Sequence, residues 1–196
     1  TGIFVNGILQ GEGTKVCRYE GRDDGVVLKT WTGTYVNGLS QGKGTAVYSF
    51  EGRDNGLVSS TSTGHFDFNG DLQGAGTVVQ RFEGRGDRKV SRTCTGHFDV
   101  NVVLQGEGAV VHTYEGQDNG LVSKTRKGTY VNGALQGRGK LVKTYKNGKT
   151  ISRNGRFNQG RFTENRSSWF KNLLLDMSKR LYYSFKRNHR VVPQLS

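Results

Sequence analysis

The chain has 196 residues, of which 30 are glycine and only one is proline. This pairing excludes collagen and a proline-rich linker, and it favours a regular structure with many glycine turns. The formal net charge of +13 suggests an acidic partner or surface, and the hydrophobic fraction of 33% is low for a compact two-layer globule.

A short pattern, glycine followed by any residue and an aromatic, recurs along the chain. Its glycines are separated by 31, 31, 32 and 32 residues, and a truncated copy follows the fifth. They are Gly2, Gly33, Gly64, Gly96, Gly128 and, in the truncated copy, Gly155. A fixed period of this length predicts a repeat architecture. A helical repeat is excluded, because no 3.6-residue hydrophobic period runs through the unit.

Each unit is predicted to form two long antiparallel arms joined by turns. Residues 57–68, which are rich in β-branched and polar side chains, predict one long strand, and residues 76–82 predict the returning strand. Hairpin turns are predicted at 23–25, 54–56 and 118–120, and a second turn, Asn-Gly-x-Leu-Gln-Gly-x-Gly, joins one arm to the next. The arms would then form a meander, stacked side by side.

Two columns of aromatic side chains support this arrangement, because stacked units bring equivalent residues onto one face. The first column is Phe4, Tyr35, Phe66, Phe98, Tyr130 and Phe157, and the second is Tyr19, Phe50, Phe82, Tyr114 and Tyr145. Both columns are interpreted as the core of the sheet.

The repeated residues resemble MORN (membrane occupation and recognition nexus) repeats over about residues 1–160. The resemblance rests on Gly33-Thr34-Tyr35-Val36-Asn37-Gly38, then Gly42-Lys43-Gly44, then Phe50 and Gly52. The units here are longer than those of the family, and an even extension of the strands keeps the two faces unchanged. The resemblance implies an elongated, single-layer antiparallel β-meander over residues 1–162. It also implies use in protein–protein assembly, self-association or membrane attachment, often beside a catalytic domain of another type.

The positive charge belongs to one end of the chain. Residues 1–126 hold 13 Lys and Arg against 14 Asp and Glu, whereas residues 127–196 hold 16 against two. The cations of the last hairpins are expected to form a basic rim: Arg138, Lys140, Lys143, Lys146, Lys149, Arg153, Arg156 and Arg161.

Residues 163–196 are predicted to form a basic amphipathic helix and a tail. Asn165-Arg166-Ser167-Ser168 is a helix N-cap signal. The apolar stripe comprises Phe170, Leu173, Leu174, Met177, Leu181 and Phe185, and cations occupy the other faces. Three interpretations remain open: a cap over the end of the array, an interfacial membrane helix, or a helix that docks into a partner protein.

The residues predicted to bind a partner combine the basic rim with this helix. They are Lys143, Lys146, Lys149, Arg153, Arg156, Trp169, Phe170, Lys179, Arg180, Lys186 and Arg187. Nucleic acid is a weaker alternative, since basic and aromatic side chains could hold phosphates and stack bases but no recognised reading element occurs.

The sequence predicts no catalytic site, cofactor or metal. It contains no nucleophile elbow, P-loop lysine or zinc-protease pattern. His65 and His97 share a repeat position and are interpreted as surface residues. Cys17 and Cys94 lack metal-ligand spacing, and as reduced thiols they suggest the cytoplasm or another reducing compartment.

Three functions follow from these observations. The first is a non-catalytic scaffold or adaptor that joins protein partners in a larger assembly. The second is a peripheral module that binds an anionic membrane. The third is a regulatory repeat domain of a larger enzyme, suggested by the start at Thr1 within a repeat.

Overall fold

A computed structural model describes residues 1–21, 25–51, 56–84, 89–116 and 119–163. These residues form one antiparallel sheet of 12 strands, and none of them is helical. The strands are β1 Gly2–Val5, β2 Ile8–Gly21, β3 Gly25–Val36, β4 Leu39–Glu51, β5 Leu57–Phe66, β6 Leu72–Glu83, β7 Lys89–Phe98, β8 Leu104–Glu115, β9 Leu121–Val131, β10 Ala134–Tyr145, β11 Thr150–Asn158 and β12 Arg161–Thr163.

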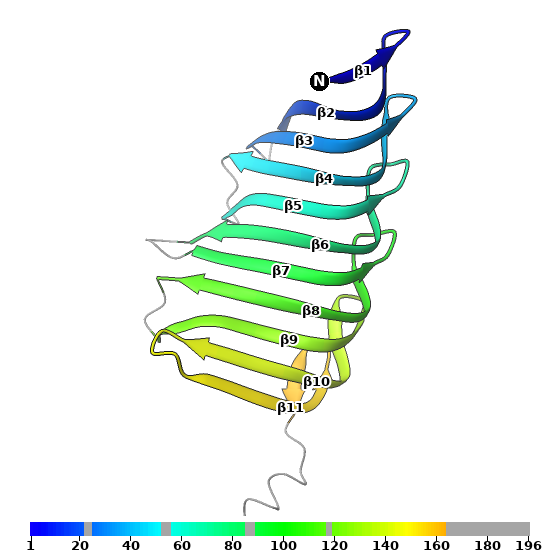
Figure 1. The fold of residues 1–196 in the computed structure, drawn as a ribbon. Coiled ribbons are helices and arrows are strands. Elements are labelled where there is room, and N and C mark those ends of the chain that lie inside the picture. Colours follow the sequence, from blue (N-terminus) through cyan, green and yellow to red (C-terminus); the bar gives the residue numbers. More distant parts are fainter. Residues whose placement is uncertain (22–24, 52–55, 85–88, 117–118, 164–196) are drawn as a thin grey trace, which may run out of the picture. The chain divides into compact units, whose positions relative to one another are not determined.

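The strands lie in the sheet in their order along the chain, from β1 to β12. Each strand therefore pairs only with its neighbours in sequence, and Figure 1 shows the resulting stack. The predicted open meander is confirmed. Residues Thr1–Phe162 form one compact unit. The predicted C-terminal helix lies outside the described residues.

The turns after the first, second and fifth aromatic residues of the repeat use the Asn-Gly pair that the sequence indicated. Asn6 and Gly7 have φ angles of 49° and 77°, and Asn37 and Gly38 have 51° and 76°. Two consecutive positive φ values give the turn whose twist matches that of paired strands. At the other end of the strands, the predicted turns at 23–25, 54–56 and 118–120 each fall partly outside the described residues.

Each unit bends at the glycine that precedes its aromatic residue. Gly96, for example, has a φ of 153°, and the register of β7 with β8 shifts directly after it. A Cβ added at Gly96 would lie 2.7 Å from Leu104 Cδ1 and 2.9 Å from the carbonyl oxygen of Glu107. Glycine is required here, because both the backbone conformation and the close strand approach exclude a side chain. The bend folds the strand ends over one face of the sheet, which we call the inner face (Figure 1).

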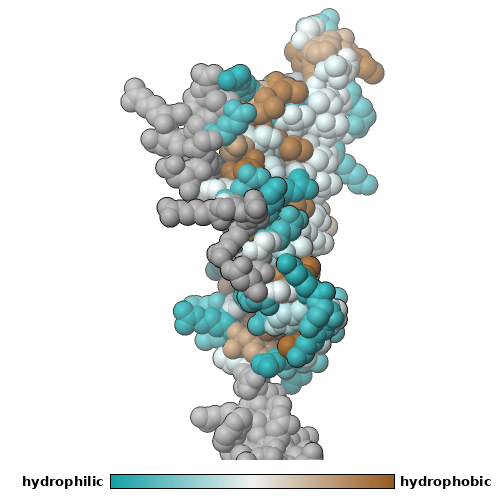
Figure 2. Space-filling view, turned by 90° about the vertical axis from the view of Figure 1, so that its left-hand side faces the viewer, coloured by the Kyte–Doolittle hydropathy of each residue, from teal (hydrophilic) through white to brown (hydrophobic). Residues whose placement is uncertain are grey.

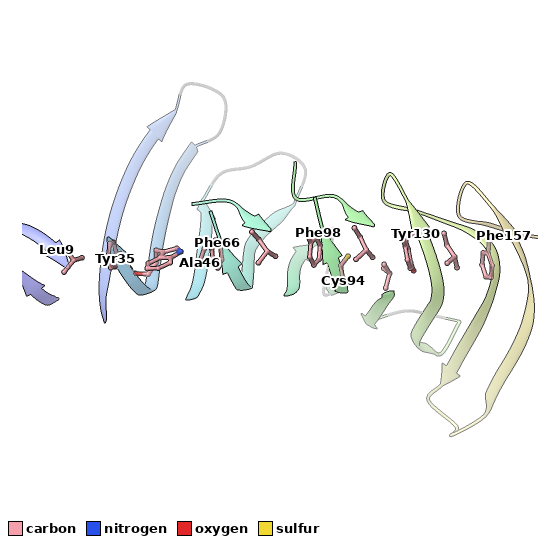
Figure 3. Close-up of a cluster of buried hydrophobic side chains, with 13 residues drawn as sticks. Leu9, Tyr35, Ala46, Phe66, Cys94, Phe98, Tyr130 and Phe157 are labelled. Carbon is pink, nitrogen blue, oxygen red and sulfur yellow. Dashed lines mark hydrogen bonds between the residues drawn. The ribbon is translucent and has the colours of Figure 1, made fainter. Parts of the chain in front are cut away.

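The core lies inside this bend (Figure 3). Besides Trp31, its buried aromatic residues are the first predicted column from the second unit onward, and they are 1–3% exposed: Tyr35, Phe66, Phe98, Tyr130 and Phe157. Phe4 is 60% exposed. The second column is not part of this core, and Tyr19 is 53% exposed. The side chains of the second column lie on the same face as those of the first, but the folded strand ends do not cover them. The prediction that the second column belongs to the core is therefore wrong.

One leucine per unit completes the core, and the second unit departs from this rule. Leu72 and Leu104 are each directly opposite the aromatic residue of their own unit. Each leucine also packs against the glycine at which that unit bends. In the second unit this position is Ser40. Trp31 fills the space instead: its ring is 2% exposed and lies against Gly33 and Gly44, the pair that leucine covers elsewhere.

The opposite side of the sheet, the outer face, carries a ladder of threonines. Cross-strand hydroxyl pairs join Thr14 to Thr32 at 3.0 Å, Thr45 to Thr63 at 3.3 Å and Thr77 to Thr95 at 3.4 Å. Paired threonines on adjacent strands stabilise a sheet by about 0.2–1 kcal/mol each. The ladder therefore supports the same register as the core on the inner face.

Candidate functional site

The predicted basic rim is divided between the two faces of the sheet. Lys143 and Arg153 occupy inner-face positions on β10 and β11, whereas Arg156 pairs with Arg138 on the outer face. Lys146 and Lys149 flank the β10–β11 turn, in which the Gly148 N–H donates to the Tyr145 carbonyl. The structure therefore does not bring these cations together as one rim.

The remaining predicted site residues belong to the C-terminal segment. They are Trp169, Phe170, Lys179, Arg180, Lys186 and Arg187. All six lie outside the described residues, so their role stays a prediction.

A row of basic side chains crosses the inner face further up the array. Arg92 on β7 is directly opposite His112 on β8, which is opposite Lys124 on β9, which is opposite Lys143 on β10. Residues directly opposite on neighbouring strands have Cβ atoms about 5 Å apart. We call these four residues the cationic row.

Sequence reasoning missed three members of this row, although a signal existed. Arg92 and Lys124 are 32 residues apart and hold the same position in successive units. A charge count did not reveal these two cations, because the positive and negative residues of 1–126 nearly cancel. Strand alternation, applied unit by unit, would have placed them on the inner face.

A hollow of about 350 Å³ lies at one end of the cationic row. Arg92, His112 and Arg126 line it from the sheet, and the turn residues Gly133 and Gln159 line it from the folded strand ends. Tyr130 and Leu135, both at most 3% exposed, belong to its floor. Its cationic side chains are half-buried, which is uncommon for lysine and arginine.

The positive charges in this region act on one another. The pKa of His112 is lowered by burial and by the nearby Arg126, Arg92 and Lys124. The pKa of Lys124 is lowered by burial and by Arg126 and Lys143. Burial is the larger cause of both pKa shifts, and the neighbouring positive charges add to it by disfavouring a further proton.

Few hydrogen bonds within the described chain reach this region. The Arg92 Nη1 donates to Gln80 Oε1 at 3.3 Å, and the buried Nδ1 of His112 has no partner among the described residues. His112 stacks on Tyr114, with ring centroids 6.3 Å apart. Among the described residues, the site therefore holds a buried imidazole nitrogen without a hydrogen-bond partner beside half-buried guanidinium groups.

Tyr130 links this site to the core and gives a prediction for alkaline pH. Its hydroxyl donates to the Arg126 carbonyl oxygen at 3.0 Å, and burial raises its pKa to about 12. The unfolded value is about 10. The stability gained from the protonated hydroxyl is thus complete below pH 10 and is lost as the pH rises from about 10 through 12.

The Tyr130→Phe variant should therefore respond less to this pH range. We expect it to lose about 1 kcal/mol of stability at neutral pH, through the lost hydrogen bond. Its free energy of unfolding should then decline less than that of the wild type between about pH 10 and 12. Urea unfolding followed by circular dichroism at each pH measures both, and identical pH dependence would contradict the assignment.

The structure shows little that resembles a catalytic or metal centre. The prediction of surface histidines is confirmed, since His65 and His97 are both exposed. The described part of the chain contains no group of three or more His, Cys, Asp or Glu that could hold a metal ion. Cys17 and Cys94 are not joined in a disulfide. No helix suited to crossing a membrane occurs in the described ranges.

A family model matches the chain at three places. The MORN repeat model matches residues 1–18, 31–49 and 127–150. These stretches are the β1–β2 hairpin up to Arg18, the bend and core of the second unit, and the bend and core of the fifth unit. The third and fourth units between them share the same bend and core geometry. No curated protein and no solved structure matches the chain.

Proposed function

Since this chain belongs to the MORN repeat family, we propose that it is a non-catalytic scaffold that joins protein partners in a larger assembly. MORN repeats are a non-enzymatic type of repeat that generally mediates protein or membrane interaction. A cytoplasmic or other reducing compartment fits its two unpaired thiols.

The observation that supports the proposal best is the different character of the two ends of the sheet. Most of the large exposed hydrophobic side chains of the described residues lie in β1–β4, including Ile3, Phe4 and Val5 at 53–67% exposure. Figure 2 shows this hydrophobic surface around the β1 end. The later strands carry the cations instead. An array with two chemically distinct ends can hold two different partners.

The scaffold proposal is tested through the basic C-terminal residues. We expect the fourfold variant Lys179→Glu, Arg180→Glu, Lys186→Glu and Arg187→Glu to keep the β-sheet circular dichroism spectrum of the wild type. Partners cross-linked to the wild type in its native extract should be lost from the variant, because the partner-facing charge is reversed. Quantitative mass spectrometry of the cross-linked material provides the measurement. Undiminished recovery of the same partners would contradict this assignment.

A peripheral membrane module is the second candidate function. It is favoured by the 16 Lys and Arg in residues 127–196, because clustered cations bind anionic lipid surfaces. Sedimentation with vesicles of phosphatidylcholine, with and without phosphatidylserine, tests it. Binding that does not depend on phosphatidylserine would contradict it.

A further inference from the structure

The cationic row is an unfavourable arrangement in the isolated sheet. Lys124 and Lys143 are directly opposite each other, and like charges in such pairs destabilise a sheet. The four side chains are also half-buried, which adds a desolvation penalty. Within the described chain, no carboxylate forms an ion pair with any of the four. A ligand of opposite charge would remove the repulsion.

The C-terminal segment does not have the charge to be that ligand. Residues 164–196 contain seven Lys and Arg but only two acidic residues, Glu164 and Asp176. A segment of the same sign as the cationic row would increase the repulsion. Residues 164–196 therefore do not have the charge of a ligand for the cationic row.

The spacing of the charges indicates what kind of anion fits. Neighbouring positions in the row are about 5 Å apart, so the four residues span roughly 14 Å. An extended acidic peptide presents carboxylates to one side only about every 7 Å, so it does not match the closer spacing of the directly opposite Lys124 and Lys143. Linked phosphate groups carry a denser charge, and guanidinium groups such as those of Arg92 and Arg126 bind phosphate in a bidentate manner.

We propose that the hollow and the cationic row together bind a small soluble polyanion that carries two or more phosphate groups. Arg92, His112 and Arg126 hold one phosphate inside the hollow, and Lys124 and Lys143 hold the next along the row. The hollow is enclosed on one side by the turn residues Gly133 and Gln159. A soluble ligand can enter this recess, whereas the flat surface of a bilayer cannot reach its half-buried side chains.

The chain offers a matched pair of variants for the test. Lys124→Gln/Lys143→Gln removes two directly opposite lysines of β9 and β10 from the inner face. Lys127→Gln/Lys140→Gln removes two directly opposite lysines of the same strands from the outer face. Both variants lose the same net charge, and both keep the basic C-terminal segment. Any difference between them therefore reports the position of the charges.

Isothermal titration calorimetry of the full chain with sodium tripolyphosphate, in phosphate-free buffer, measures the affinity. We expect the inner-face variant to bind about 10-fold or more weakly than the wild type, because two charge-assisted contacts are lost. The outer-face variant should bind within about twofold of the wild type. Thermal unfolding without ligand serves as the folding control, and the inner-face variant should be no less stable than the wild type.

The four histidines of the chain report where the ligand sits. His112 lies in the proposed site, His65 and His97 are exposed elsewhere, and His189 belongs to the C-terminal segment. Tripolyphosphate should shift the imidazole NMR signals of His112 while leaving those of His65 and His97 in place. A shift confined to His189 would place the anion on the C-terminal segment and overturn the proposal.

Three further results would also overturn it. One is an equal loss of affinity in the two paired variants, which would indicate general attraction by a basic protein. Another is stronger binding of a short glutamate oligomer than of tripolyphosphate. The third is binding to vesicles that contain phosphatidylinositol bisphosphate without binding to tripolyphosphate. The protein would then bind phosphate groups only as part of a membrane surface.

Discussion

The substitution Trp31→Ser is expected to lower the free energy of unfolding by about 3–5 kcal/mol, the usual loss for removing a large buried aromatic side chain. Trp31 is 2% exposed and packs edge-on against Tyr35 and Phe66, with ring centroids 4.8 and 5.9 Å apart. No leucine stands in this unit to fill the space that the indole leaves. Thermal and urea unfolding followed by circular dichroism measure the loss.

Adding Ser40→Leu to Trp31→Ser should restore most of that stability. The double variant gives the second unit the pattern of the third, where Ser62 and Leu72 occupy the equivalent positions. It also removes the buried indole N–H of Trp31, which has no hydrogen-bond partner among the described residues.

The single variant Ser40→Leu is the control for this rescue. With Trp31 still in place, the added leucine overfills the core, and we expect a loss of about 1–3 kcal/mol. The two changes should therefore couple strongly in a double-mutant cycle. Independent, additive effects would show that the indole does not substitute for the leucine.

The substitution Gly96→Ala is expected to destabilise the sheet by about 1–3 kcal/mol, and by more if the bend opens. Alanine rarely adopts the φ of 153° found here, and its methyl group would overlap Leu104 and the carbonyl oxygen of Glu107. Opening the bend would expose Phe98, which is 3% exposed in the structure. Hydrogen exchange of the β7 and β8 amides, together with thermal unfolding, should show the damage.

Gly106→Ala is the matched control for the bend. Gly106 also has a positive φ, of 65°, but a Cβ at this position would meet nothing within 4 Å. We expect about 1 kcal/mol of destabilisation from the backbone conformation alone. Equal losses in the two variants would mean that close packing at the bend contributes nothing.

Much of the fold was predictable because its signals are local. The Asn-Gly pairs predict turns from one arm to the next, and the regular return of glycine and an aromatic predicts equivalent strands. The sharp bend was not predicted, because a glycine in a strand indicates either a bulge or a close approach without saying how far the strand turns. Without the bend, the two aromatic columns look equivalent in sequence, although only the first is enclosed.

The candidate site was predictable only in part. The charge count indicated the last hairpins, and Lys143 is the one residue that it shares with the cationic row. Arg92 and His112 reach the same row only through the pairing register of the four successive strands β7 to β10, which the charge count does not contain. The exchange between Ser40 and Trp31 was visible in the sequence as two departures from the repeat. The sequence does not show that Trp31 compensates for the missing leucine. Only the structure shows that the Trp31 ring occupies the space over Gly33 and Gly44 that a leucine fills in other units.

The strand order from β1 to β12 without any crossover also has a consequence for folding. Every strand pairs with the strand that follows the next turn. Each pairing therefore closes only a short loop, and little conformational entropy is lost before the strand pair forms its hydrogen bonds. The array can nucleate at any one hairpin and then grow in both directions by nearest-neighbour steps. A substitution that destabilises a middle unit would therefore uncouple the strands on its two sides. The two shorter blocks of strands would then unfold in separate transitions.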